Sequence, residues 1–206
     1  MKGVNLIEGK VGIAELRKFS ISEEEARKYN LYNRLRGKPN FLSVSKGDYV
    51  KLYVNGELMM SDTDMEKKTN EDFVRAAKGE ILIAGLGIGL LIENLKEKID
   101  KGIITKITIV EKYQDVIDLI APHYDIPQIH IECADIFERK INKGEKYDAI
   151  YFDIWSTICP DNYNEMKELK NKYRRCKRTK NSYVGCWLEK IVKTMYLREK
   201  RGDVVW

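Results

Sequence analysis

Hydrophobic residues in the second half of the chain fall into short aliphatic runs that alternate with amphipathic stretches. Runs that are apolar at almost every position are typical of strands buried on both faces of a parallel sheet. The pattern predicts strands within 81–84, 106–111, 129–137, 147–155 and 182–187, and helices over 90–99, 114–121, 161–177 and 188–200. This alternation predicts an α/β fold, a Rossmann-like, doubly wound and mostly parallel sheet with helices on both faces.

The first 78 residues lack this alternation, and we expect them to form a small N-terminal appendage to a sheet domain at 79–206. Ser22 begins a capping-box sequence, which predicts a helix that runs toward Leu35. Asn55-Gly56 lies between alternating segments and predicts a type I′ hairpin. The appendage is therefore expected to contain a helix and a β-hairpin.

Three closely spaced glycines follow the first predicted strand of the sheet. At Gly85, Gly87 and Gly89 the backbone can approach a ligand closely, and the N–H groups of the next helix point into the same space. A dinucleotide fingerprint would carry its third glycine where this chain has Leu90. The spacing therefore favours a nucleotide-binding loop of another type, and a tightly packed turn without a ligand is the alternative.

Acidic residues stand at the ends of the next three predicted strands. Glu111 ends the second strand, where a βαβ unit places an acid that accepts both ribose hydroxyls of a nucleotide. Asp135 and Asp153 follow the third and fourth strands. Ligands of open α/β sheets bind outside the carboxyl ends of the strands, so we expect these acids and the glycines to converge on one crevice. Any single acid could instead end its strand or cap a helix.

The glycine spacing and the strand-end acids resemble the class I S-adenosylmethionine (SAM) dependent methyltransferase superfamily over about residues 78–190. The resemblance implies SAM as the cofactor, with Asp135 at the adenine amino group and the segment from Asp153 onward facing the reacting methyl group. Within the superfamily, residues 49–63 look similar to the hairpin that precedes the nucleotide domain in the spermidine synthase-like branch. That branch usually ends in a closing hairpin, which residues 202–206 are too short to supply. An open sheet edge would suit a partner chain, so a homo-oligomer is left open.

Two departures from that branch bear on the reaction. Aminopropyltransferases that resemble this fold carry an acid inside the glycine loop and two acids three residues apart after the fourth strand. Here Ile88 and Ser156 replace two of these acids, which leaves Asp153 alone. Because desolvating an unpaired ammonium costs several kcal/mol, a single carboxylate is a poor site for a diamine. We predict methyl transfer, with a polyamine aminopropyltransferase-like enzyme or a non-catalytic nucleotide- or nucleic-acid-binding protein as alternatives.

The segment after the fourth strand supplies the candidate catalytic residue. Asp153 is expected to accept the proton of an incoming nitrogen or oxygen if its apolar neighbours raise its pKa. Trp155 offers a cation–π surface to the sulfonium or to the acceptor, with core packing as its alternative role. The acceptor, a small molecule or a macromolecule, is left open by the sequence.

Cysteines and histidines are few and scattered. Four cysteines without C-x-x-C spacing and two histidines predict neither a metal site nor a disulfide framework. No apolar run approaches the roughly 18 residues of a membrane span, and the N-terminus does not resemble a signal peptide. We expect a cytoplasmic protein that does not bind membranes.

Positive charge gathers in residues 166–201, which hold 13 Lys or Arg against three acids. Such a block can contact a phosphate backbone, and Tyr173, Tyr183 and Tyr196 lie within it. However, the charges fall on two predicted helices that a strand separates, rather than along one face. The sequence therefore favours a solvated or partner-packing surface over a nucleic-acid partner.

Overall fold

The computed structural model describes residues 4–37 and 42–202. The chain forms two compact units and passes between them several times. The first unit comprises Met1–Arg75, Leu86–Glu97 and Tyr113–Asp125, and the second comprises Ala76–Gly85, Lys98–Lys112 and Ile126–Trp206. The domain boundary after residue 78 falls close to the first of these crossings and stays a prediction.

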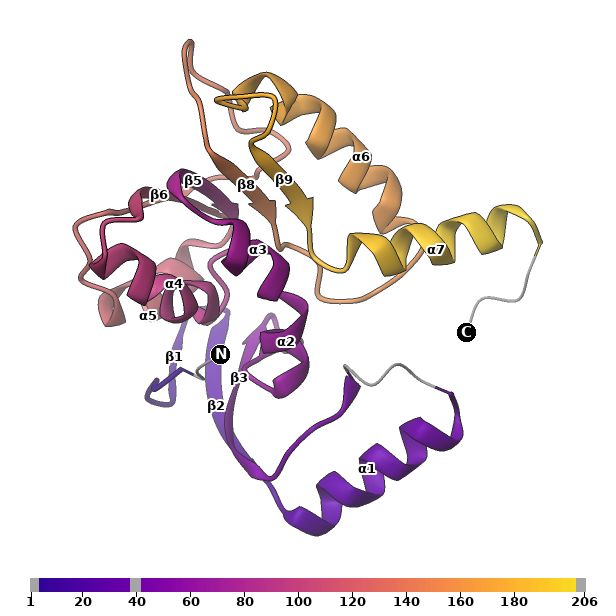
Figure 1. Cartoon of the computed structure of the whole chain (residues 1–206). Helices are drawn as coiled ribbons and strands as arrows, with labels where there is room; N and C mark the ends of the chain where they lie inside the picture. The colour runs from indigo at the N-terminus through magenta and orange to yellow at the C-terminus, as the bar shows by residue number, and fades with distance from the viewer. Residues whose placement is uncertain (1–3, 38–41, 203–206) are drawn as a thin grey trace. The chain divides into compact units, whose positions relative to one another are not determined.

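The first unit contains a four-stranded antiparallel sheet in the order β1-β2-β3-β4 (Figure 1). Its strands are β1 (Gly9–Val11), β2 (Ala14–Ile21), β3 (Gly47–Val54) and β4 (Glu57–Ser61). Asn55 and Gly56 join β3 to β4 with φ angles of 53° and 80°, as a type I′ turn requires, so the hairpin prediction is confirmed. The expectation of one hairpin and a helix was incomplete, because it omitted β1 and β2. Their signal was weak, since β2 buries only Ala14 and Leu16.

The capping box at Ser22 forms as predicted. The Glu25 N–H donates to Ser22 Oγ (3.2 Å), and the Ser22 N–H donates back to Glu25 Oε2 (2.8 Å). The other helices that begin in this unit include α5, where Asp115 Oδ2 accepts a hydrogen bond from the Ile13 N–H (2.9 Å) and ties the helix to the turn after β1. The helices are α1 (Glu23–Leu35), α2 (Asp64–Thr69), α3 (Glu71–Ala76), α4 (Leu90–Asp100) and α5 (Gln114–Ile120).

The second unit contains the predicted parallel sheet. Its strands are β5 (Gly79–Ala84), β6 (Ile104–Glu111), β7 (Ile129–Cys133), β8 (Ala149–Phe152) and β9 (Tyr183–Cys186). They pair in the order β7-β6-β5-β8-β9, and every pairing is parallel. The first strand of the sheet is therefore its central strand, and the strand order reverses beside it. That position is the topological switch point where α/β sheets bind ligands.

Both faces of the central strands are buried, which explains their continuous aliphatic character. Ile81 and Ile83 are 0% and 1% exposed on one face. Leu82 and Ala84 point to the other face, where a buried core cluster includes residues of α6 (Asn162–Lys172) and α7 (Glu189–Lys200). Figure 1 shows α6 beside β8 and β9. Fully burying one aliphatic side chain of this size contributes about 1.5 to 3 kcal/mol.

The third and fourth strands are shorter than the segments 129–137 and 147–155 that contain them, but they end where predicted, before the turn at Asp135 and beside Asp153. β7 ends at Cys133 and β8 at Phe152, and the residues after each strand form loops. The helix predicted over 161–177 is likewise shorter, because α6 ends at Lys172 and a 3-10 turn follows it. Asp135 and Asp153 interrupt the apolar pattern after the two strands, whereas Tyr173 and Cys176 continue it past α6 and are buried.

The connection from β7 to β8 is held by a buried arginine. Arg139, whose side chain is 6% exposed, forms ion pairs with Glu132 (2.6 Å) and Glu145 (2.7 Å). These hydrogen bonds, the one to Glu132 foremost, raise the pKa of Arg139. Tyr147 donates its hydroxyl to Glu145 Oε1 (2.8 Å). The cluster joins the segment that leaves the carboxyl end of β7 to the segment that enters the amino end of β8.

None of the helices in the described ranges is long and apolar enough to cross a membrane. β7 and β9 are the edge strands of the parallel sheet, and the homo-oligomer stays a prediction. The missing closing hairpin was expected from residues 202–206, of which 203–206 lie outside the described residues.

Candidate functional site

The hydrogen-bond ladder of the parallel sheet continues one step past its central strands. The Gly85 N–H donates to the carbonyl of Val110 (2.8 Å), and the Asp153 N–H donates to the carbonyl of Ala84 (2.9 Å). Glu111, the last residue of β6, follows Val110 directly. The structure therefore brings Gly85, Glu111 and Asp153 to the carboxyl edge of the second unit's sheet, at the switch point.

Position 85 requires a glycine, because the ends of two strands approach each other closely there. Its φ angle is 97°, and a Cβ atom there would overlap the backbone carbonyl oxygen of Asp153. A backbone atom of a paired strand cannot move aside easily, so only glycine fits. The first glycine of the predicted loop thus has a structural role at the site itself.

Two carboxylates at the carboxyl ends of β6 and β7 have different surroundings. Glu111 is only 7% exposed, which is rare for a glutamate. Asp135 accepts hydrogen bonds from the Phe137 N–H (2.9 Å) and from Lys112 Nζ (2.9 Å). Burial acts to raise the pKa of Asp135, but Lys112 and the Phe137 N–H outweigh it and leave the pKa below its ordinary value. Asp135 is therefore ionised at neutral pH, with acceptor capacity left for a ligand.

Lys112 was not singled out from the sequence, although its position directly after Glu111 was a readable signal. It places a cation against Asp135. Glu165 was also missed. Its Oε2 accepts a hydrogen bond from the indole Nε1 of Trp155 (2.6 Å), which links the loop after β8 to α6. Trp155 also packs against the buried core cluster of the unit, as its alternative role required.

Gly87 and Gly89 belong to the first unit, where side chains pack against them. A Cβ at Gly87 would overlap the sulfur of Met60, and one at Gly89 would overlap the ring of Tyr124. The Ile88 N–H donates to Met60 Sδ (3.4 Å), and the Tyr124 hydroxyl donates to the Ile88 carbonyl (3.2 Å). These contacts match the packed-turn alternative. No local signal in the sequence pointed to Met60 or Tyr124.

A scan of protein-family models finds no match to this sequence, and a search of curated proteins finds none. Among solved structures, the chain is similar to a SAM-dependent methyltransferase of Leishmania major (17% identity, TM-score 0.42). It is also similar to the methyltransferase CcbJ of Streptomyces caelestis and the N-methyltransferase NodS of Bradyrhizobium japonicum (each 14% identity, TM-score 0.43).

These matches cover 58%, 57% and 58% of this chain and 47%, 47% and 66% of the other chains, so the chain spans less than two thirds of each. Similarity at this level does not assign an activity, which has to be argued from the residues of the site.

Proposed function

We propose that this chain is a SAM-dependent methyltransferase whose cofactor binds at the carboxyl edge of the second unit's parallel sheet. The observation that carries the proposal is the convergence of Gly85, Glu111 and Asp153 at the topological switch point. The two carboxylates at this edge are hydrogen-bond acceptors that suit the cofactor. Glu111 would accept the ribose hydroxyls, and the ionised Asp135 would accept the adenine amino group. The roles of Gly87 and Gly89 stay predictions.

When bound, SAM supplies a methyl group on a sulfonium, and the protein's share of such a displacement is largely positioning. We assign to the Asp153 carboxylate the role of general base, which accepts the proton from a nitrogen or oxygen of the methyl acceptor. Trp155 would offer its ring face to a cationic centre, with its indole plane held by the hydrogen bond to Glu165. The acceptor is a small molecule or a macromolecule of unassigned class.

The finer assignment that we propose is the spermidine synthase-like branch, without its polyamine chemistry. Support comes from the β-rich first unit, whose β3–β4 hairpin occupies residues 47–61. Ile88 and Ser156 stand where that branch carries acids, which favours methyl transfer over aminopropyl transfer. We also propose a cytoplasmic location, because all four cysteines are free thiols, as a reducing compartment allows.

Calorimetry with SAM, S-adenosylhomocysteine, methylthioadenosine and NAD tests the cofactor. We expect SAM to bind and Glu111→Ala to weaken it by at least about tenfold, because hydrogen bonds to a charged group contribute about 1.5 to 3 kcal/mol each. Glu138→Ala, which removes an exposed acid of the same unit, should leave the affinity unchanged. A preference for NAD, or SAM binding insensitive to Glu111→Ala, would overturn the proposal.

A second experiment separates the reactions. With decarboxylated SAM and putrescine we expect no methylthioadenosine, and formation at an enzymatic rate would establish aminopropyl transfer instead. With SAM and cell extract we expect S-adenosylhomocysteine, and Asp153→Asn should abolish it while SAM still binds. If neither product forms, the non-catalytic binding protein is the correct alternative.

A further inference from the structure

The amino ends of β5, β8 and β9, in the second unit, carry a concentration of basic side chains. We call this surface the amino-end basic edge. It consists of residues that immediately precede these strands or lie in the loops leading to them: Lys78, Lys146, Arg174, Arg175, Lys177, Arg178 and Lys180. Five of the seven come from the loop between α6 and β9, and two come from outside the basic stretch at 166–201.

Backbone pairing brings the two long loops of the edge together. Tyr147 forms an isolated parallel bridge with Lys177, and the Arg178 N–H donates to the Tyr147 carbonyl (2.8 Å). Lys146 Nζ donates to the carbonyl of Arg175 (2.6 Å). Charges that are about thirty residues apart in the chain therefore share one surface.

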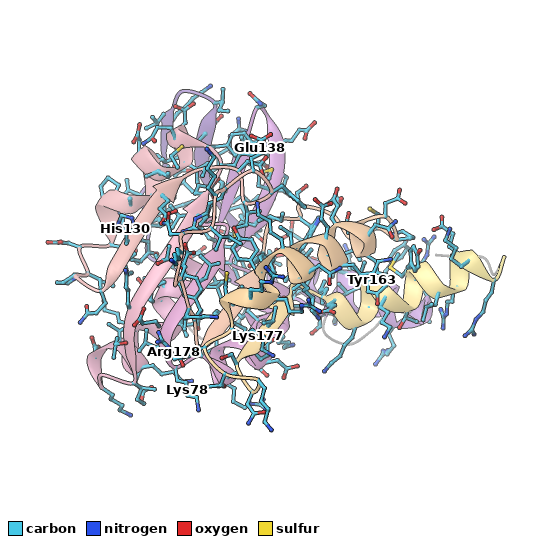
Figure 2. All side chains as sticks on the ribbon, turned by 90° about the horizontal axis from the view of Figure 1, so that it is seen from above. Lys78, His130, Glu138, Tyr163, Lys177 and Arg178 are labelled. Carbon is cyan, nitrogen blue, oxygen red and sulfur yellow. The ribbon has the colours of Figure 1, made fainter. Side chains whose placement is uncertain are left out.

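The nearest acids are already neutralised. Arg178 donates from Nε to Asp148 (3.1 Å) and forms a second ion pair with Glu80 (3.0 Å). Lys78 is exposed and directly precedes Gly79, which lies against Asp148. Figure 2 shows Lys78, Lys177 and Arg178 near one another, with Glu138 away from them. Glu80 and Asp148 are thus both engaged by one arginine, and Glu145, which precedes Lys146, is engaged by the buried Arg139.

Three cations of the edge are available to a partner. Arg174, Arg175 and Lys180 are exposed, and none of them forms an ion pair with any residue in the described ranges. An arginine guanidinium matches the geometry of a phosphate with two parallel N–H donors, so two adjacent arginines suit a phosphodiester chain.

We propose that the amino-end basic edge binds the phosphate backbone of a nucleic acid. The sequence favoured a solvated surface because the charges fall on two predicted helices, whereas the edge is built from loops that the fold brings together. Ile103, whose carbonyl accepts the Gly79 N–H, is an exposed large hydrophobic side chain at this end of the sheet, and none lies between 138 and 182 in the described ranges. A membrane is disfavoured, because one apolar side chain does not make the apolar face that an interfacial segment buries. Tyr147 and Tyr173 are buried and Tyr183 is half-buried, and contacts to phosphate carry no sequence information, so binding should not depend on base sequence.

The edge lies at the opposite ends of the strands from the proposed cofactor site, so the two proposals stand independently. Fluorescence anisotropy with a labelled single-stranded RNA and a labelled DNA duplex tests the edge, between about 50 and 200 mM salt. We expect the logarithm of the affinity to fall linearly with the logarithm of the salt concentration, with a slope of about −0.7 to −0.9 per phosphate contacted. The probe that binds more tightly identifies the kind of nucleic acid.

The triple variant Arg174→Ser, Arg175→Ser, Lys180→Ser should reduce affinity at least about tenfold near 0.1 M salt and reduce the slope by about 2 to 3. Its matched control, Lys193→Ser, Arg198→Ser, Arg201→Ser, removes three exposed cations at α7 and should change affinity less than about twofold. An unchanged urea unfolding midpoint would show that the triple variant is folded. Equal losses in both variants, no binding at the lowest salt, or binding only to anionic lipid vesicles would overturn the proposal.

Discussion

The two ends of the second unit's parallel sheet have opposite character. The carboxyl end carries Glu111, Asp135 and Asp153, whereas the amino end carries the amino-end basic edge. The central strands β5 and β8 are largely apolar, so most of the polar residues at the two ends come from strand termini and from the loops beyond them. One sheet can therefore present two unrelated polar surfaces, each assembled from loops that its strand order brings together.

Glycines at the two ends of β5 sharpen this comparison. Gly79 and Gly85 have φ angles of 64° and 97°. A Cβ at Gly79 would meet the carboxylate of Asp148, which is the far end of a side chain, whereas a Cβ at Gly85 would meet a backbone carbonyl. The carboxyl end is therefore the less tolerant of the two.

We expect the largest effect on stability at Arg139, whose cluster joins the carboxyl end of β7 to the segment that enters the amino end of β8. Arg139→Met should lower the free energy of unfolding by about 3 to 5 kcal/mol, because it leaves Glu132 and Glu145 without their buried cation. Urea unfolding measures the change. Lys140→Met, at the exposed neighbouring position, should change the free energy by no more than about 0.5 kcal/mol. A similar small change at Arg139 would show that the cluster does not join the two ends.

Gly85→Ala should have the next largest effect. We expect it to lower the free energy of unfolding by about 3 kcal/mol, because left-handed strain and backbone overlap add together. Gly102→Ala is the matched control, because Gly102 has a φ angle of 66° and open space around its Cβ position. Its cost should be about 1 kcal/mol, that of the conformation alone. Equal costs in urea titrations would contradict the close approach at the carboxyl end.

Gly79→Ala should lower the free energy of unfolding less, by about 2 kcal/mol. The Asp148 side chain can rotate away from the added Cβ, although it then loses its ion pair with Arg178. The same substitution in an Asp148→Ala background should cost only about 1 kcal/mol. A double-mutant cycle measures the difference. Strict additivity would mean that Asp148 does not restrict Gly79.

The smallest effect concerns pH. Burial acts to raise the pKa values of Asp135 and Glu145, but hydrogen bonds and nearby cations outweigh it and hold both pKa values below their ordinary values. Their contribution to stability is present above the unfolded pKa of about 4 and is lost as the pH falls through the lower folded values. Thermal unfolding between about pH 5 and 3 should show this loss, and Asp135→Asn or Glu145→Gln should each flatten the profile. An unchanged profile would show that these carboxylates do not titrate differently on folding.

Much of the sheet and its carboxyl end was predictable because local patterns determine them. Aliphatic runs identify buried strands, and in a parallel sheet every residue that follows a strand lies at the same edge, so Glu111 and Asp153 could be placed together from the sequence. β2 escaped because Arg17 and Lys18 interrupt its alternation. The contacts of Met60 and Glu165 could not be foreseen, because each joins segments with no shared pattern. The basic edge was hidden for the same reason, since Lys78 and Lys146 lie far from 166–201.

The strand order also has a consequence for synthesis of the chain. β5 is the central strand, but its neighbour β8 ends only at Phe152, and β9 follows at Tyr183–Cys186. At a ribosomal rate of about 5 to 20 residues per second, several seconds pass between synthesis of β5 and synthesis of β8, so one edge of the aliphatic strand β5 stays unpaired during that time. During that interval the edge is open to other nascent chains, so we expect expression yield to depend on chaperones that shield β5 and β6.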